Sequence, residues 1–252
     1  LATVVQDGIS EASVTQTFNR DGSMNFSADV IQDGSGNDTT IVQSDNNAGV
    51  IPGGPDKDVF ASTNQVGSGN GASISQEGRA FPDLSLNAYI TQIGDDNLAS
   101  IDQDGKTNTS TINQIDGAAF NTASISQSGF RVEGTITQTG DDNDASITQQ
   151  AGDADATIFQ SGNGNVASID QPSGRYLTAD ITQTGNDNGG SIFQLSGDGN
   201  TASILQSTDG NFATISQSGG DGNSAVISQT AAGNAMGSIT QTGTGNSASI
   251  SQ

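Results

Sequence analysis

The 252-residue chain contains no cysteine, no histidine and no tryptophan. The absence of cysteine excludes a disulfide scaffold. The absence of both cysteine and histidine excludes thiolate and imidazole metal ligands and a Cys–His nucleophile–base pair. Aromatic residues make up 4% of the chain, and no apolar run approaches the ~18 residues of a membrane-spanning helix. We therefore expect no membrane insertion and no catalytic, cofactor-binding or metal-ligating residue.

Basic residues are also scarce. Six Lys and Arg against 28 Asp and Glu leave a formal net charge of −22 at pH 7. A protein that binds nucleic acid electrostatically needs a basic surface, so no nucleic-acid partner is expected. Few aromatic residues, 34 glycines and a high net charge are typical of a disordered chain. The order of the residues contradicts that interpretation.

Glutamine recurs at a nearly constant spacing along the chain. Of the 22 glutamines, all but Gln150 fall in one register, and from Gln65 onward their spacing is nearly always 11 or 12 residues. Two residues before them stands Ile or Val in 20 of 21 cases, Thr63 being the exception, and four residues before them stands Ala, Gly, Ser or Thr. The complete unit reads Gln-x-Gly-x-x-Asn-x-Ala-x-Ile-x-Gln, as in residues 138–149. Such a register predicts a repeat architecture.

The defined positions of a unit alternate along the chain, as Asn143, Ala145, Ile147 and Gln149 do. A period of two predicts a β-strand with two distinct faces. Because the face with isoleucine must be the interior, Ala, Gln and Asn are expected to point inward too, while the Ser and Thr between them face solvent. Glycine fills the second place after Gln in 12 of 20 connecting arcs, where we expect a sharp turn and a positive φ.

A strand and arc of 11–12 residues are too short for a helical crossover, and stacking every second strand in parallel places like residues on like. The sequence therefore predicts an all-β fold, a two-sheet β-solenoid of about 11 rungs of 22–23 residues with parallel, in-register, amyloid-like stacking. The expected rungs pair residues 2–6 with 12–16, 28–32 with 39–43, 48–52 with 61–65, and so on to 237–241 with 248–252. This count includes a degenerate unit in which Asn46, Ala48, Val50 and Pro52 keep the spacing.

The inward amides are the most informative side chains. A buried amide without a partner costs about 1–3 kcal/mol, but an amide stacked on identical neighbours can donate and accept along the axis, as in amyloid Asn and Gln ladders. We therefore predict a stacking ladder. Its expected members are Gln65, Gln76, Gln92, Gln103, Gln114, Gln127, Gln138, Gln149, Gln160, Gln171, Gln183, Gln194, Gln206, Gln217, Gln229 and Gln241, with Asn70, Asn97, Asn143 and Asn165.

The first third of the chain is less regular than the rest. We expect loop insertions near residues 17–27, 44–64 and 77–87, carried on a single β-solenoid that spans residues 1–252. The chain begins with Leu and not Met, which predicts a processed chain from which a signal peptide has been removed.

The unit resembles the curlin repeat of bacterial curli fibre subunits, Gln-x-Gly-x-Gly-Asn-x-Ala-x-x-x-Gln. Residues 65–76, 160–171 and 241–252 match it at every defined position, and residues 138–149 have Asp for the second Gly. The resemblance covers essentially the whole chain. It departs from the familiar subunit in having about twice as many rungs and in lacking the Gly/Asn-rich leader that precedes the repeats there.

This resemblance implies the major structural subunit of an extracellular functional amyloid, a cell-surface fibre of the biofilm matrix with adhesive function. It also implies a nucleator subunit and an outer-membrane secretion pore as partners, and it favours a left-handed solenoid, although the pattern itself leaves the handedness open. No enzymatic activity is expected.

The ends of the repeat favour polymerisation. An end rung exposes unpaired backbone, which soluble solenoids cover with polar caps. Here the first unit begins at Ala2 and the last residue is itself a repeat glutamine, which predicts a head-to-tail homopolymer. The residues expected at the subunit interface are Ala2, Val4, Gln6, Val14, Gln16, Ile239, Gln241, Ala248, Ile250 and Gln252.

Four other functions fit the sequence less well than a fibre subunit. A monomeric β-solenoid scaffold needs polar caps over its end rungs, whereas the repeat units here run from Ala2 to Gln252. An ice-binding solenoid displays an outward Thr-x-Thr array, which appears here only at Thr135 and Thr137. A calcium-binding β-roll adhesin has a nine-residue repeat with Asp at fixed places, whereas Asp changes position between these arcs. A carbohydrate-active β-helix enzyme needs carboxylates around a cleft, whereas acidic pairs such as Asp141 and Asp142 are adjacent in sequence.

Overall fold

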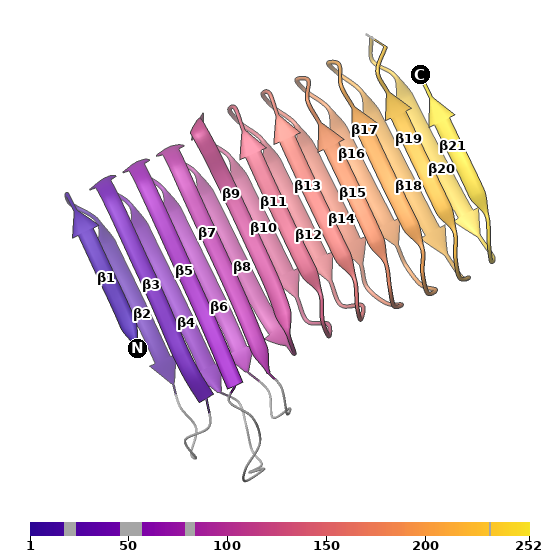
Figure 1. Ribbon diagram of the computed structural model, residues 1–252. Helices are drawn as coiled ribbons and strands as arrows, with labels where there is room; N and C mark the ends of the chain where they lie inside the picture. Colours follow the sequence, from indigo (N-terminus) through magenta and orange to yellow (C-terminus); the bar gives the residue numbers. More distant parts are fainter. Residues whose placement is uncertain (18–23, 46–56, 79–83, 232) are drawn as a thin grey trace.

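The structure is a computed structural model that describes residues 1–17, 24–45, 57–78, 84–231 and 233–252. These residues form 21 β-strands and no helix, arranged as two parallel sheets that lie face to face (Figure 1). Odd-numbered strands form one sheet and even-numbered strands the other.

The 11-stranded sheet contains β1 (Ala2–Asp7), β3 (Met24–Ser35), β5 (Lys57–Ser68), β7 (Ser85–Asp95), β9 (Asn108–Ala119), β11 (Glu133–Thr139), β13 (Asp155–Ser161), β15 (Thr178–Gln183), β17 (Thr201–Gln206), β19 (Ser224–Gln229) and β21 (Ser247–Ser251). The 10-stranded sheet contains β2 (Glu11–Thr17), β4 (Asp38–Asp45), β6 (Gly71–Gly78), β8 (Leu98–Gly105), β10 (Thr122–Gln127), β12 (Asp144–Gln149), β14 (Val166–Gln171), β16 (Gly189–Gln194), β18 (Phe212–Ser218) and β20 (Met236–Thr242).

Neighbouring strands within a sheet stack like residue on like residue. Between β12 and β14, for example, Ala145 pairs with Ala167, Ile147 with Ile169, and Gln149 with Gln171. Because side chains alternate between faces, this register places the repeat Ile and Gln of each strand on the same inner face. The predicted two-sheet β-solenoid with parallel, in-register stacking is confirmed.

The expected count of 11 rungs is slightly too high. The described residues give 11 strands in one sheet and 10 in the other. Gln65 pairs directly with Gln32, and Gln76 with Gln43, so no strand lies between them in either sheet. The pairing of residues 48–52 with 61–65 is therefore wrong, and 61–65 form a rung with 72–76. The degenerate unit itself lies outside the described residues.

Part of the expected insertions is strand. Residues 24–27, 57–64 and 85–87 belong to β3, β5 and β7, which are 12, 12 and 11 residues long. Phe26, Val59 and Leu86 stack in register, and together with Leu84 they form a buried apolar cluster. Extending the strands buries these side chains, which explains the difference. Residues 18–23, 46–56 and 79–83 lie outside the described part of the chain.

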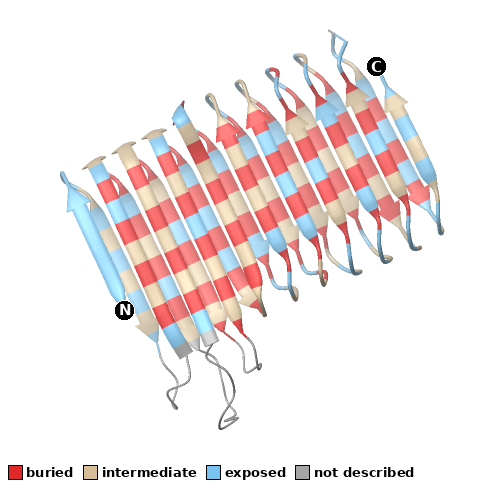
Figure 2. Cartoon of the chain, viewed as in Figure 1, coloured by how far each residue is buried: buried red, intermediate tan, exposed pale blue. Residues whose placement is uncertain are grey.

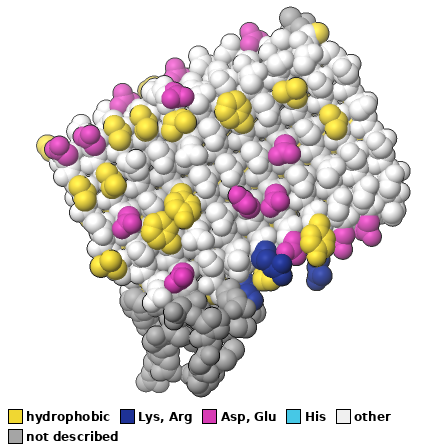
Figure 3. Space-filling view, in the orientation of Figure 1, with side chains coloured by type: hydrophobic (Ala, Val, Ile, Leu, Met, Phe, Trp, Pro, Cys, Tyr) yellow, Lys and Arg dark blue, Asp and Glu magenta, His cyan; other side chains and the backbone are white. Residues whose placement is uncertain are grey.

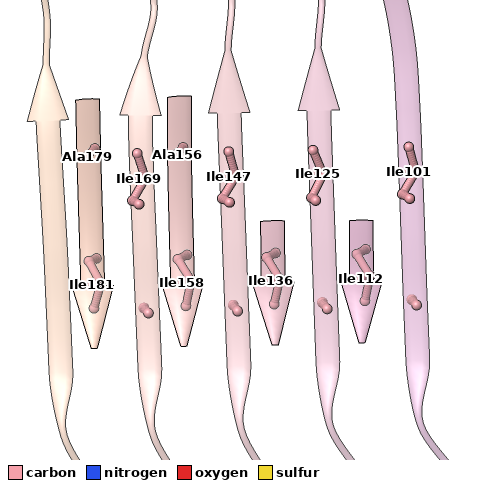
Figure 4. Close-up of a cluster of buried hydrophobic side chains, with 14 of the residues drawn as sticks. Ile101, Ile112, Ile125, Ile136, Ile147, Ala156, Ile158, Ile169, Ala179 and Ile181 are labelled. Atoms are coloured by element: carbon pink, nitrogen blue, oxygen red, sulfur yellow. The ribbon is translucent and has the colours of Figure 1, made fainter. Parts of the chain in front are cut away.

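The core is a thin apolar layer between the sheets. Figure 2 shows buried and exposed residues alternating along the strands, and Figure 4 shows the isoleucines of each sheet aligned in a row across neighbouring strands. Most strands contribute an Ile and a small residue to this layer, such as Ile147 with Ala145 and Ile158 with Ala156, all buried. The small residues let the sheets approach closely, so packing is tight although the side chains are few.

Arcs join the sheets along two edges of the solenoid. Arcs from odd to even strands form the upper edge of Figure 1, and arcs from even to odd strands form the lower edge. Of the 12 glycines expected to turn the chain after Gln, eight have a positive φ: Gly8, Gly34, Gly67, Gly94, Gly140, Gly162, Gly219 and Gly243.

Candidate functional site

Two ladders of glutamine amides run along the interior, one in each sheet. In the 11-stranded sheet the chain of hydrogen bonds runs from Gln6 to Gln252, and in the 10-stranded sheet from Gln16 to Gln241. Each Nε2 donates to the Oε1 of the next glutamine over 2.6–3.1 Å. All 19 bonds point the same way, so each ladder has a donor end and an acceptor end.

The same amides also join the two sheets. Gln149 Nε2 donates to the carbonyl of Glu133 at the start of the facing strand β11 and to the carbonyl of Ala154 in the next arc, each over 3.0 Å. A primary amide has two N–H donors, so one proton continues the ladder and the other reaches main chain at the edge of the core. Glutamine therefore stands at the end of each strand, where it closes the interior.

The structure places all 16 predicted ladder glutamines in these two chains, each at most 5% exposed. It adds five glutamines that the predicted ladder omitted: Gln6, Gln16, Gln32, Gln43 and Gln252. They share the same register in the sequence, so the repeat could have identified them. Thr39 and Ser110 were not predicted to take part; their hydroxyls donate to Oε1 of Gln65 and Gln127 over 2.8 and 2.7 Å.

Asparagine forms a third ladder along the upper edge. Asn70, Asn97, Asn143 and Asn165 belong to it, together with the unpredicted Asn37, Asn121, Asn188 and Asn211. Each Oδ1 accepts the main-chain N–H of the next asparagine, for example over 3.0 Å from Asn165 to Asn143. At the lower edge Asn200, Asn223 and Asn246 form a shorter ladder of the same kind. In three other lower arcs the Asn position is filled by Val132, Ala154 and Leu177, which form a separate buried apolar cluster with Ala151.

The terminal strands leave interior groups uncovered. Val4 is 45% exposed, and Ile250 and Ala248 pack on the core only partly buried. Val14 and Gln16 are half-buried, and Ala2, Gln6 and Gln252 are exposed. Ile239 and Gln241, both on β20, are buried. The predicted interface residues thus lie at the two ends of the stack, in positions that are buried elsewhere in it.

At the two ends of the stack, the glutamine ladders have hydrogen-bonding groups with no further glutamine partner in the described residues. Nε2 of Gln241 and Gln252 donates to the carbonyls of Ser224 and Met236, and no further glutamine follows in the described residues. At the opposite end, Oε1 of Gln6 and Gln16 accepts no hydrogen bond from the described residues. Donors at one end therefore complement acceptors at the other.

Carboxyl groups are spread over the arcs and outer faces. Hydrogen bonds from the side chain and main chain of Ser68 lower the pKa of Asp95. Partial burial, with a smaller effect of Asp155, raises the pKa of Asp180, so its ionised form is less favourable in the fold and this cost disappears as the pH falls. Within the described residues, no three acidic side chains gather as they would around a metal ion.

The comparison with known families agrees with this geometry. The model of the curlin associated repeat matches residues 85–118, 121–150, 153–185 and 185–219, which together cover just over half of the chain, from β7 to β18. The chain belongs to the curlin-repeat family. The strands outside the matched region of this curlin-repeat protein continue the same glutamine register and the same ladders. No curated protein sequence matches the chain.

Family and fold point to a structural protein. In the curlin-repeat protein the defined repeat residues are buried and hydrogen-bonded to one another, and do not surround a cleft. The described residues contain no helix of sufficient length and apolarity to cross a membrane.

Proposed function

We propose that this curlin-repeat protein is the major subunit of an extracellular, curli-type fibre that polymerises head-to-tail and forms adhesive biofilm matrix, with a nucleator subunit and an outer-membrane secretion pore as partners. The carrying observation is the pair of glutamine ladders whose donor and acceptor ends both lie open at the terminal strands. Stacking of subunits would satisfy these amides and continue both sheets. The chain forms one continuous solenoid body in this fibre.

The strand count makes the contact specific. In fibres of this 252-residue chain, unbroken stacking places β1 on β20 and β2 on β21, because β21 extends one strand beyond β20. Gln241 then donates to Gln6 of the next subunit, and Gln252 to Gln16. Since β1 and β20 belong to different sheets, each subunit must be turned by half a turn about the fibre axis relative to its neighbour.

Cysteine cross-linking tests this contact, since the chain has no cysteine of its own. Ser249 on β21 and Ser13 on β2 are exposed and lie at opposite ends of one subunit. With both changed to cysteine, in-register stacking brings the two Cα atoms about 5 Å apart, within disulfide range. Oxidised fibres should then give covalent multimers on a denaturing gel.

The matched control combines Ser249→Cys with Thr3→Cys. Thr3 lies on β1, which the half-turn stacks on β20 in the other sheet. The two substituted positions should therefore lie on opposite faces of the fibre and not cross-link. Covalent multimers from this control and none from the Ser13 pair would contradict the half-turn. Fibres that form without either cross-link would show that growth does not use these strands.

An inward charge at the end of the stack should block growth. Ile250 is only partly buried in the subunit, but it would be enclosed by β2 of the next one. Burying an unpaired ion costs several kcal/mol, so Ile250→Lys should fold and yet lose seeded elongation, followed by thioflavin fluorescence. Ser249→Lys, which faces outward, should elongate nearly normally. Elongation of Ile250→Lys at the parent rate would remove the C-terminal strands from the interface.

Acidification should accelerate assembly. With a net charge of −22 at pH 7 and a sequence pI of about 4.1, subunits repel one another near neutral pH. The thioflavin lag time should shorten as the pH falls toward the pI, and also when salt reduces the Debye length to ~10 Å or less. A lag that lengthens under both conditions would contradict this electrostatic account.

A further inference from the structure

In the described arcs, basic side chains lie on one edge of the solenoid only. The upper-edge arcs contain Asp95, Asp96, Asp116, Asp141, Asp142, Asp187 and Asp209 and no Lys or Arg. Lys106, Arg131 and Arg175 lie together on the lower edge, where Figure 3 shows the basic side chains gathered beside exposed apolar ones. The lower-edge arcs also carry Asp153, Asp198 and Asp221, so the complement to the acidic upper edge is this local basic cluster and not the whole lower edge.

The basic residues border a hollow that we call the basic groove. Its lining includes Lys106, Phe130, Arg131, Gly152, Arg175 and Tyr176, together with one acidic residue, Asp153. Its volume is about 740 Å³. The Phe130 ring lies under two cations, with Lys106 Nζ 5.2 Å and Arg131 Cζ 4.4 Å from its centroid. Arg131 also pairs with Asp153 over 3.2 Å. At the middle of the groove, Gly152 contributes no side chain.

The upper edge carries a projection that we call the acidic ridge: Asp96, Phe120 and Asp142. Main-chain hydrogen bonds stack these arcs on successive rungs. Both carboxylates are exposed, and Phe120 is 60% exposed between them. An apolar ring flanked by two carboxylates is the chemical counterpart of a groove with two guanidinium groups around a bare glycine.

Both surfaces contain non-glycine residues with a positive φ. Ten described non-glycine residues have a positive φ, and six of them are Asp or Asn, which tolerate it best. The other four are Thr107, Phe120, Arg131 and Tyr176, with φ between 54° and 61°. All four lie in arcs of the ridge or the groove. Bulky residues in this region are strained, and the Phe120 ring is largely exposed.

The spacing of the charges is the same on both edges. Arg131 and Arg175 are two rungs apart, as are Asp96 and Asp142, or about 10 Å at the usual strand spacing. We infer that the acidic ridge of one filament docks into the basic groove of a second, parallel filament of the same chain, displaced sideways by one filament width and along the axis by one and a half rungs. Asp96 then meets Arg131, Asp142 meets Arg175, and Phe120 enters the groove over Gly152.

This lateral contact rests on the proposed fibre, because a few surface ion pairs hold weakly by themselves and gain strength when a polymer repeats them along its length. With a half-turn between successive subunits, two parallel filaments make the contact in every second subunit. Salt acts in two directions. Net negative charge repels filaments at low ionic strength, and high salt weakens the contact pairs. Since the Debye length is about 10 Å at 0.1 M, bundling should be greatest near that salt concentration and decline toward 1 M.

Charge exchange between the two surfaces provides the test. Preformed fibres are incubated in about 0.1 M salt, and bundling is measured by low-speed sedimentation and by filament width in electron micrographs. Fibres of Arg131→Glu/Arg175→Glu and fibres of Asp96→Arg/Asp142→Arg should each elongate at the parent rate but remain single. When the two kinds of fibre are mixed, each provides the partner that the other lacks, and bundling should return. Arg131 shows that arginine is accommodated at the φ of Asp96.

Two further variants separate the contact from net charge. Asp187→Arg/Asp209→Arg makes the same charge change on the upper edge outside the ridge and should retain bundling. Phe120→Asn suits a positive φ and removes only the ring, so it should fold and elongate normally while bundling less.

Several outcomes would overturn the inference. These are parent fibres that stay single, bundling retained in either charge-reversed fibre, or a mixture that does not bundle. If the groove instead binds a polyuronate, and Arg131→Glu/Arg175→Glu abolishes that binding while parent fibres stay single, its partner is an acidic polysaccharide. Absence of fibres altogether, seen before any bundling measurement, would refute the proposed function as well.

Discussion

Replacement of Gly67 by alanine is expected to destabilise the fold by roughly 2–6 kcal/mol. Gly67 has φ +119°, which L side chains rarely adopt, and a Cβ there would overlap the carbonyl oxygen of Gly94 in the next rung. Such a backbone outlier costs about 1–3 kcal/mol, and overpacking against a neighbour that cannot move costs about as much again. Gly94 is held in place by the stack of arcs. The carbonyl group of Gly67 packs against Cα of Gly34, and the carbonyl group of Gly94 packs against Cα of Gly67 in the same way.

Gly222→Ala separates the two causes. Gly222 has φ +66°, but a Cβ at this position meets nothing within 4 Å. We therefore expect only the cost of the left-handed conformation, about 1–2 kcal/mol. Denaturant unfolding of both variants measures the difference. If Gly67→Ala and Gly222→Ala lose the same stability, close stacking of successive arcs is not what requires glycine.

Removal of one glutamine from the ladder should be nearly as damaging. In Gln149→Ala, Oε1 of Gln171 loses the proton it accepts over 3.0 Å, and Nε2 of Gln127 loses its acceptor at 2.9 Å. The Glu133 and Ala154 carbonyls lose a donor as well. A buried group left unpaired costs about 1–3 kcal/mol, and with the cavity the total should reach about 2–4 kcal/mol.

The neighbouring residue provides the control. Thr148 is partly exposed on the outer face of β12, so Thr148→Ala should change the free energy of unfolding by less than ~0.5 kcal/mol. The comparison uses denaturant midpoints of the soluble chain before assembly. Equal losses from the two variants would mean that the buried amide ladder does not stabilise the fold.

The interior of this protein could be derived from the sequence because its period is local. A two-residue alternation decides which face each side chain occupies, so Ile147, Gln149 and Asn143 were correctly placed inside before any partner was known. The exceptions followed the same rule. Where Asn is missing, Phe26, Val59, Val132 and Leu177 are apolar and buried.

The ladders followed from the interior assignment. An unpaired buried amide is costly, and identical residues at the same place in successive rungs provide the partner. Where a strand departs from the repeat, as at Thr39 and Ser110, the hydroxyl still bonds to a ladder amide. Thr39 and Ser110 lie in strands that the sequence predicts, but the tertiary structure decides which amide each hydroxyl reaches.

Long-range pairing was decided by the tertiary structure. Periodicity fixes the face of a strand but not which strand lies next to it, so the sequence placed residues 48–52 opposite 61–65, whereas Gln65 stacks directly on Gln32. The lengths of β3, β5 and β7 depend likewise on Phe26, Val59 and Leu86 meeting across three rungs, which no single unit encodes.

The surfaces also depend on the tertiary structure. The sequence alone does not bring Asp96 close to Asp142, or Arg131 close to Arg175, because the members of these pairs are 46 and 44 residues apart in the chain. The solenoid brings each pair to within two rungs on one edge. The repeat thus determines the interior by itself, whereas the arrangement of ridge, groove and open ends arises from how many rungs stack and in which order, because distances between arcs are set by strand pairing and not by sequence separation.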